Sequence, residues 1–161
     1  MVDNEIMYVS KECHEKMHNE LTMLTTVRRK EISRQIAEAR SHGDLSENAE
    51  YDAAKESQAM NEIKIADLEQ KISCARIMDE NAIPLNKAVL GTTVTLKDLN
   101  DGEKICYALV SEPEADISID KISVDSPVGK GLLGHKENDI IEIKVPAGIL
   151  KYKIIKIERS R

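Results

Sequence analysis

A stop signal for one helix and a start signal for the next adjoin in His42-Gly43-Asp44-Leu45-Ser46-Glu47. Glycine takes the left-handed conformation after a helix at little cost, so His42-Gly43 is expected to end the first helix. Asp44, followed three residues later by Glu47, forms a D-x-x-E capping box that predicts a new helix with Asp44 as its N-cap. Almost no loop remains between the two helices.

The residues on both sides of this junction carry apolar side chains at helical spacing. Pro and Gly are absent from Ser10 to His42, where intervals of 3 and 4 link Met17, Leu21 and Leu24, then Ile32, Ile36 and Ala39. The second helix, which we expect to reach about Met78, has a seam at Tyr51, Ala54, Gln58, Asn61, Ile65, Leu68, Ile72 and Ala75. Two such helices, each roughly 48 Å long at 1.5 Å per residue, must lie antiparallel and form a rod.

The second half of the chain has short β-like runs instead. A linker at 81–87, which contains Pro84, separates the predicted hairpin (1–80) from a sheet domain (88–161). The predicted strands are Gly91–Leu96, Ile105–Val110, Ile140–Val145 and Leu150–Ile157, and Asn100-Asp101-Gly102 is a hairpin turn. Ser126–Leu133 is expected to be a short helix with Pro127 at its first position. The predicted fold class is α+β: a coiled-coil helical hairpin and a small antiparallel sheet domain with one helix.

Composition and charge exclude several classes of protein. The 161 residues include four Tyr but no Trp or Phe, which suits an elongated helical segment better than a compact globule. Residues 1–80 carry a net charge of −6 and residues 81–161 a net charge of 0, the opposite of the basic surface of an autonomous nucleic-acid binder. Three scattered cysteines and the absence of an apolar run at the N-terminus predict a cytoplasmic protein without a membrane partner.

Two motifs resemble known sites, and we interpret both as structural. His14-Glu15-Lys16-Met17-His18 matches H-E-x-x-H, but a catalytic zinc needs a third ligand and a cleft, which a two-helix rod does not provide. Adventitious zinc binding to the two histidines stays open. Gly129-Lys130-Gly131-Leu132-Leu133-Gly134 matches G-x-G-x-x-G, but a dinucleotide site needs a parallel βαβ unit around it. A short helix and turn is the simpler interpretation.

Asp44 and Glu47 allow two interpretations. Their spacing fits a helix cap. The same spacing also places two carboxylates at the end of a rod, and hard oxygen ligands of this kind suit Mg²⁺, which commonly takes only one or two carboxylates from a protein. Two ligands are too few to hold Mg²⁺ tightly, so a partner would have to complete such a site.

Several motifs over nearly the whole chain resemble the Gre family of bacterial transcript-cleavage factors, and more closely its GreA branch than GreB. They are Thr26-Val27-Arg28-Arg29, Ile36-Ala37-Glu38-Ala39-Arg40, the run from His42 to Lys55, Asp125-Ser126-Pro127 and Gly131-Leu132-Leu133-Gly134. The resemblance implies a coiled-coil hairpin and an FKBP-like domain. It also implies that the hairpin enters the secondary channel of backtracked RNA polymerase and stimulates the polymerase's own cleavage of the nascent RNA, so that the protein is a cofactor rather than an enzyme.

The resemblance also implies roles for individual residues. Asp44 and Glu47 would be the catalytic pair and would share a Mg²⁺ ion with the polymerase's aspartates. Arg40 and Lys55 would face RNA phosphates near the 3′ end. The other implied positions are tip supports at Gly43, Ser46, Asn48 and Tyr51, and polymerase-docking residues at Asp125, Ser126 and Pro127. We expect a monomer.

Two alternatives belong to other functional classes. A channel-occupying inhibitor of the same fold would bind polymerase without promoting cleavage, but the intact Asp44/Glu47 pair argues against it. A prolyl isomerase is suggested by the FKBP-like fold alone, and that activity needs an aromatic-lined pocket. The second half offers Tyr107 and Tyr152 for such a pocket.

Overall fold

The computed structural model describes residues 5–44 and 48–161. The chain divides into two compact units, Met1–Arg76 and Ile77–Arg161. Within the described residues, no helix combines the length and the apolar character needed to cross a membrane.

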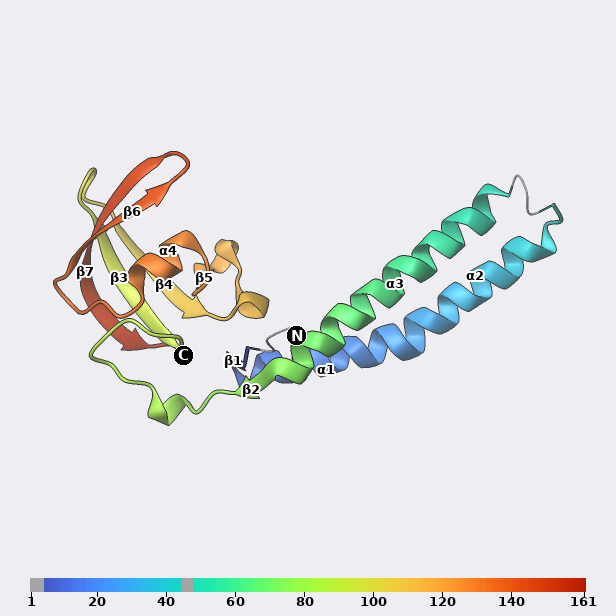
Figure 1. The fold of residues 1–161 in the computed structure, drawn as a ribbon, viewed down its shortest axis with the longest axis horizontal. Coiled ribbons are helices and arrows are strands. Elements are labelled where there is room, and N and C mark those ends of the chain that lie inside the picture. The colour runs from blue at the N-terminus through green and yellow to red at the C-terminus, as the bar shows by residue number, and fades with distance from the viewer. Residues whose placement is uncertain (1–4, 45–47) are drawn as a thin grey trace. The chain divides into compact units, whose positions relative to one another are not determined.

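The first unit is an antiparallel helical hairpin (Figure 1). Its first arm contains strand β1 (Met7–Val9), helix α1 (Lys11–Met23), a π-helical turn η1 (Leu24–Arg28) and helix α2 (Arg29–Ser41). Its second arm is helix α3 (Ala49–Cys74), followed by strand β2 (Ala75–Ile77), which pairs with β1. The predicted helical start and stop are confirmed, since the Ser10 side chain caps α1 and Gly43 follows α2 with a φ of 105°.

Both ends of α3 differ from the prediction. The N-cap is Asn48, not Asp44, because the Asn48 side chain accepts a hydrogen bond from Tyr51 N. The predicted capping box is therefore wrong at Asp44, and Glu47 lies outside the described residues. The helix ends at Cys74 rather than near Met78, because Ala75 turns extended (ψ 138°) and begins the strand that pairs with β1.

The two predicted seams face each other. In the first arm Met17, Ile32, Ile36 and Ala39 are buried, and in the second arm so are Ala54, Asn61, Ile65, Leu68 and Ala75. The other seam positions are half-buried: Leu21, Leu24, Tyr51, Gln58 and Ile72. The spacing of 3 and 4 therefore identified the inner face of each arm correctly.

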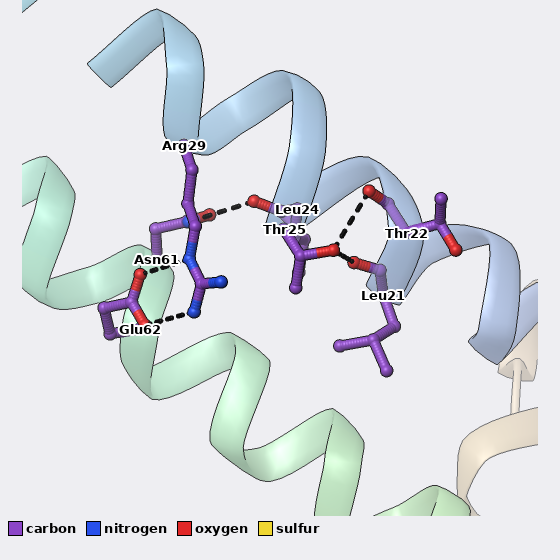
Figure 2. A network of polar contacts seen from close by, with 7 residues as sticks. All are labelled: Leu21, Thr22, Leu24, Thr25, Arg29, Asn61 and Glu62. Atoms are coloured by element: carbon purple, nitrogen blue, oxygen red, sulfur yellow. Dashed lines mark hydrogen bonds and ion pairs between the residues drawn. The ribbon is translucent and has the colours of Figure 1, made fainter. Parts of the chain in front are cut away.

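The π-helical turn interrupts what was predicted to be one uniform helix. Figure 2 shows its polar contacts: the Thr25 hydroxyl donates to the carbonyls of Leu21 (2.8 Å) and Thr22 (3.2 Å). The Leu24 carbonyl accepts from Arg29 N, five residues later, and from Asn61 Nδ2 in α3 at 3.3 Å. A π turn holds one more residue than an α turn. It therefore absorbs an extra residue in the first arm.

The second unit is a five-stranded sheet in the order β5-β4-β3-β7-β6 (Figure 1). Its strands are β3 (Thr92–Asp98), β4 (Lys104–Val110), β5 (Lys121–Ser123), β6 (Ile140–Val145) and β7 (Gly148–Arg159). The four predicted strands and the hairpin turn between β3 and β4 are confirmed. The sheet is mixed rather than antiparallel, because β5, which was not predicted, pairs parallel to β4. Its three residues are too few to produce a recognisable alternation.

Helix α4 (Pro127–Leu132) has Ser126 as its N-cap and Pro127 in its first turn, as predicted. Short 3₁₀ turns occupy η3 (Glu80–Ala82), η4 (Glu112–Glu114) and η5 (Ile117–Ile119). The core packs α4 against the sheet and includes Val94, Leu96, Leu109, Leu132, Ile141, Ile143, Tyr152 and Ile154.

The two tyrosines considered for an isomerase pocket belong to this core. Tyr152 is buried, and its burial raises the pKa of the phenol. Tyr107 is half-buried and packs against the same cluster. Both side chains therefore serve packing, which removes the aromatic basis of the isomerase alternative.

Candidate functional site

The tip of the hairpin is held by Asn48, whose side chain bonds to both arms. Its Oδ1 accepts from Tyr51 N at 3.1 Å and so caps α3. Its Nδ2 donates to the Ala39 carbonyl, in the last turn of α2, at 2.6 Å. One amide therefore bonds an N–H at the start of one helix and a carbonyl at the end of the other, a carbonyl that also accepts from His42 N at 3.3 Å.

Two further contacts join the same two helical turns. The Arg40 guanidinium lies over the Tyr51 ring, 5.9 Å from its centroid, within the range of a cation–π interaction. His42 Nδ1 lies 2.9 Å from Glu50 Oε2. Arg40 and Tyr51, expected as an RNA contact and a tip support, are thus brought together, and a His42–Glu50 pair that was not predicted lies beside them.

In the chain, the proposed catalytic segment follows His42 and precedes Asn48. Gly43 and Asp44 are both exposed. Asp44 lies two residues beyond His42, the C-cap of α2. Ser46 and Glu47 lie outside the described residues. Since Asn48 caps α3, Asp44 is not required as its cap. The N-cap of α3 is therefore assigned to Asn48 instead of Asp44.

Lys55, the other proposed RNA contact, is exposed on α3 one turn beyond Tyr51, and its Nζ donates to Gln58 Oε1 at 2.8 Å. It lies on the opposite arm from Arg40. The two expected basic residues therefore flank the tip from different helices.

The metal interpretation of the tip depends on which side chains could act as ligands. Within residues 5–44 and 48–161, no three His, Cys, Asp or Glu side chains gather closely enough to hold a metal ion. His14 and His18 lie close together, with their rings tilted by 57° and their centroids 4.6 Å apart, but no third such side chain joins them among the described residues. An exposed Asp44 fits a half-site that offers a hard oxygen ligand, the type that Mg²⁺ prefers.

The proposed docking residues surround the start of α4. The Ser126 hydroxyl donates to the Ser123 carbonyl (2.6 Å) and accepts from Gly129 N (3.0 Å), so it holds the loop together. Asp125 and Pro127 are exposed on either side. Of the three, Asp125 and Pro127 are exposed at the surface, whereas Ser126 shapes the loop.

The G-x-G-x-x-G motif is explained by packing, as predicted. A Cβ on Gly129 would meet the Ser123 carbonyl oxygen at 2.1 Å, and one on Gly131 would meet Ile143 Cγ1 at 2.7 Å. Gly134 has a φ of 81° at the end of the helix. All three glycines therefore serve the helix and its turn.

Comparison with known proteins covers both units. Residues 7–77 match the family described as Transcription elongation factor, N-terminal, and residues 83–159 match Transcription elongation factor, GreA/GreB, C-term. The chain belongs to the GreA/GreB family of transcription elongation factors. Transcription elongation factor GreA of Chloroherpeton thalassium is 50% identical over 94% of this chain and 96% of that protein. GreA of Flavobacterium psychrophilum is 47% identical over 96% of this chain and 98% of that protein.

Among solved structures, GreA factor homolog 1 (Gfh1) of Thermus thermophilus is 29% identical. The match covers 96% of this chain and 99% of that chain, with a TM-score of 0.45.

Sequence reasoning missed two features of this GreA/GreB-family tip. It assigned the cap to Asp44, although Asn48 followed by Glu50 and Asp52 in the first turn is also a helix-start signal. It also missed the His42–Glu50 pair, because the two residues belong to different helices and nothing in their spacing links them.

Proposed function

We propose that this chain stimulates the cleavage of backtracked nascent RNA by RNA polymerase, with the hairpin tip entering the secondary channel. The observation that carries the proposal is an exposed Asp44 at the end of a two-helix rod whose second helix is capped by another residue. Membership of an elongation-factor family supports it. The chain acts as a monomeric cytoplasmic cofactor and leaves the bond cleavage to the polymerase.

Asp44 and Glu47 would hold the Mg²⁺ ion together with carboxylates of the polymerase. When bound, the ion supplies a water of lowered pKa and neutralises charge on the phosphate. The chain contributes two carboxylates at the end of a narrow rod. Because the hairpin carries a net negative charge, the tip does not trap RNA by itself and depends on the polymerase to present it.

The polymerase-facing roles of the remaining residues follow from their exposure. Arg40 and Lys55 flank the tip from opposite arms and would face phosphates of the RNA 3′ segment. Asp125 and Pro127 would contact the rim of the channel, on a loop held by Ser126. The second unit would thereby dock while the hairpin delivers the carboxylates.

The test is Asp44→Asn and Glu47→Gln on a purified backtracked elongation complex, with the RNA products sized over time. An amide oxygen is a much poorer Mg²⁺ ligand than a carboxylate, so cleavage should fall by orders of magnitude. Raised Mg²⁺ should partly restore it by mass action. Far-UV circular dichroism and competition with the parent protein should show unchanged folding and polymerase binding.

The channel-occupying inhibitor predicts a different result. In that case the parent protein itself would bind the complex and leave the RNA intact, and the two amide variants would behave like the parent. Normal cleavage by both variants at low Mg²⁺ would show that the carboxylates have no metal-binding role.

A further inference from the structure

We propose that Asn48 is the positioning residue of the cleavage tip, acting through its bond to the opposite arm and not only as a helix cap. This inference rests on the proposed function of Asp44 and Glu47. The inference is based on two hydrogen bonds made by the Asn48 side chain. Its Oδ1 accepts from Tyr51 N, and its Nδ2 donates to the Ala39 carbonyl. The second bond joins the end of α2 to the start of α3 directly across the junction.

Side-chain packing alone holds the arms weakly at this level. Beyond Ile36 the buried seam residues Ala39 and Ala54 are small, only 2% and 5% exposed, and the half-buried Tyr51 ring packs beside them against Ile36 and Ala54. A groove of about 320 Å³ lies between α2 and α3 there, lined by Ala39, Ala53 and Ala54 and edged by Glu38, His42 and Glu50. Because few large apolar side chains meet at this level, directional polar bonds contribute to fixing the separation and the rotation of the two helix ends.

Among the described residues, three polar contacts cross between the arms here, and they differ in strength. Arg40 is exposed beside the half-buried Tyr51 ring, and His42 and Glu50 are both exposed to water, so each of these two contacts contributes little. The Asn48–Ala39 bond is short at 2.6 Å and partly buried. It also ends on backbone, so it fixes the main chain rather than a flexible side chain.

The consequence reaches the two carboxylates through the chain. Glu47 directly precedes Asn48, and Asp44 lies five residues after Ala39. In the chain, both carboxylates therefore lie between the two residues that this bond joins. A displacement of about 1 Å at a reacting group can lower a rate by roughly a hundredfold, so loss of the bond should reduce cleavage without changing how the factor binds.

The experiment separates the cross-arm bond from the cap. Asn48→Asp and Asn48→Ser both keep an oxygen that caps α3, since Ser, Asp and Asn are all strong N-caps. Asp has no side-chain N–H to donate to the Ala39 carbonyl, and Ser holds its only donor one bond closer to its own backbone and so farther from that carbonyl. The matched control is Asn61→Ser, which removes the other amide-to-carbonyl bond between the arms, far from the tip. Asp44→Asn reports on the proposed function itself.

The readout is single-turnover cleavage of a backtracked complex over a range of factor concentrations. For both Asn48 variants the rate at saturation should fall roughly ten- to hundredfold while the half-saturating concentration stays unchanged. Helical circular dichroism at the assay temperature should match the parent. Asn61→Ser should cleave at the parent rate.

Parent-like cleavage by Asn48→Ser and Asn48→Asp, with Asp44→Asn inactive, would overturn the positioning role and leave the proposed function intact. The same is true if the half-saturating concentration rises while the saturated rate is kept, or if Asn61→Ser is equally slow. Normal cleavage by Asp44→Asn would refute the proposed function, and the inference with it.

Discussion

Two asparagines, at different levels of the hairpin, make the same kind of hydrogen bond between its arms. Asn48 at the tip and Asn61 at mid-rod each donate a side-chain N–H to a backbone carbonyl of the opposite arm. Asn61 is only 5% exposed within an otherwise largely apolar stretch of the seam. A buried polar group is tolerated when it is hydrogen-bonded, and here the partner is the carbonyl at the start of the π turn. These two residues therefore add a directional bond to the backbone of the opposite arm at two levels of the seam.

At the docking loop, we predict that Gly129→Ala destabilises the second unit by about 1–3 kcal/mol. The added Cβ would lie 2.1 Å from the Ser123 carbonyl, which is backbone and cannot move without displacing the Ser126 hydroxyl bonds. Urea unfolding measures the loss. Gly131→Ala is the control: its Cβ meets a side-chain atom, Ile143 Cγ1 at 2.7 Å, instead of backbone, so it should cost less. Equal costs for the two would contradict the backbone-contact argument.

Between elements, the two arms differ in the length of their seam repeat. In α3 the seam returns every seven residues, from Tyr51 to Gln58, Ile65 and Ile72. In the first arm the steps are 7, 8 and 7, at Met17, Leu24, Ile32 and Ala39. The extra residue coincides with the π turn Leu24–Arg28. The π turn thus keeps both halves of the first arm facing α3.

If the π turn keeps the two arms in register, the effect of Asn61→Leu on the stability of the hairpin should change sign when Thr26 is deleted. In the parent chain, Asn61→Leu should destabilise the hairpin, because the Leu24 carbonyl loses its donor. After deletion of Thr26, which restores seven-residue steps, Asn61→Leu should stabilise it, because an apolar residue then completes a regular seam. The coupling should be about 1 kcal/mol or more, as expected for neighbouring residues. Urea unfolding followed by helical circular dichroism measures it, and identical effects in both backgrounds would count against the coupling.

The link between Arg29 and Glu62 predicts a pH dependence. Two hydrogen bonds of 2.8 and 2.7 Å join these side chains of α2 and α3, and the bonds from Arg29 lower the pKa of Glu62 below its ordinary value of 4.5. A lowered carboxyl pKa contributes stability that is present above the unfolded-state pKa and lost as the pH falls through the folded-state pKa.

The difference in melting temperature between the parent and Glu62→Gln should therefore be present at pH 7 and disappear in acid below pH 4.5. Because both side chains are about half exposed, it should be small and shrink in high salt. A difference that persists in acid would point to packing of the side chain instead.

At the scale of the whole molecule, two units with separate cores predict separable activities. Residues 1–80 alone should be strongly helical by circular dichroism. Residues 85–161 alone should fold and compete with the intact protein for polymerase without stimulating cleavage. Undetectable binding by the second fragment, together with full binding by the hairpin alone, would overturn the docking assignment of Asp125 and Pro127.

Much of the fold could be predicted because its signals are local or periodic. The inner faces of both arms follow from apolar spacing, the stop at Gly43 from its freedom at positive φ, and the start of α4 from Ser126-Pro127. The candidate carboxylates could be named from their place at the junction. What their spacing could not decide was whether Asp44 or Asn48 caps the second helix.

The amino-acid sequence by itself determined a hairpin, a sheet domain and an acidic junction, since each depends on residues close together in the chain. The tertiary structure alone decided which residue caps the second helix. Asn48 takes that place, and its side chain also bonds to the Ala39 carbonyl of the other arm. The tertiary structure likewise decided the ends of the hairpin, where β2 leaves the helix to pair with β1, and the parallel placement of β5 beside β4. In each case the deciding partner is distant in sequence, and its hydrogen bonds exist only once the chain has folded.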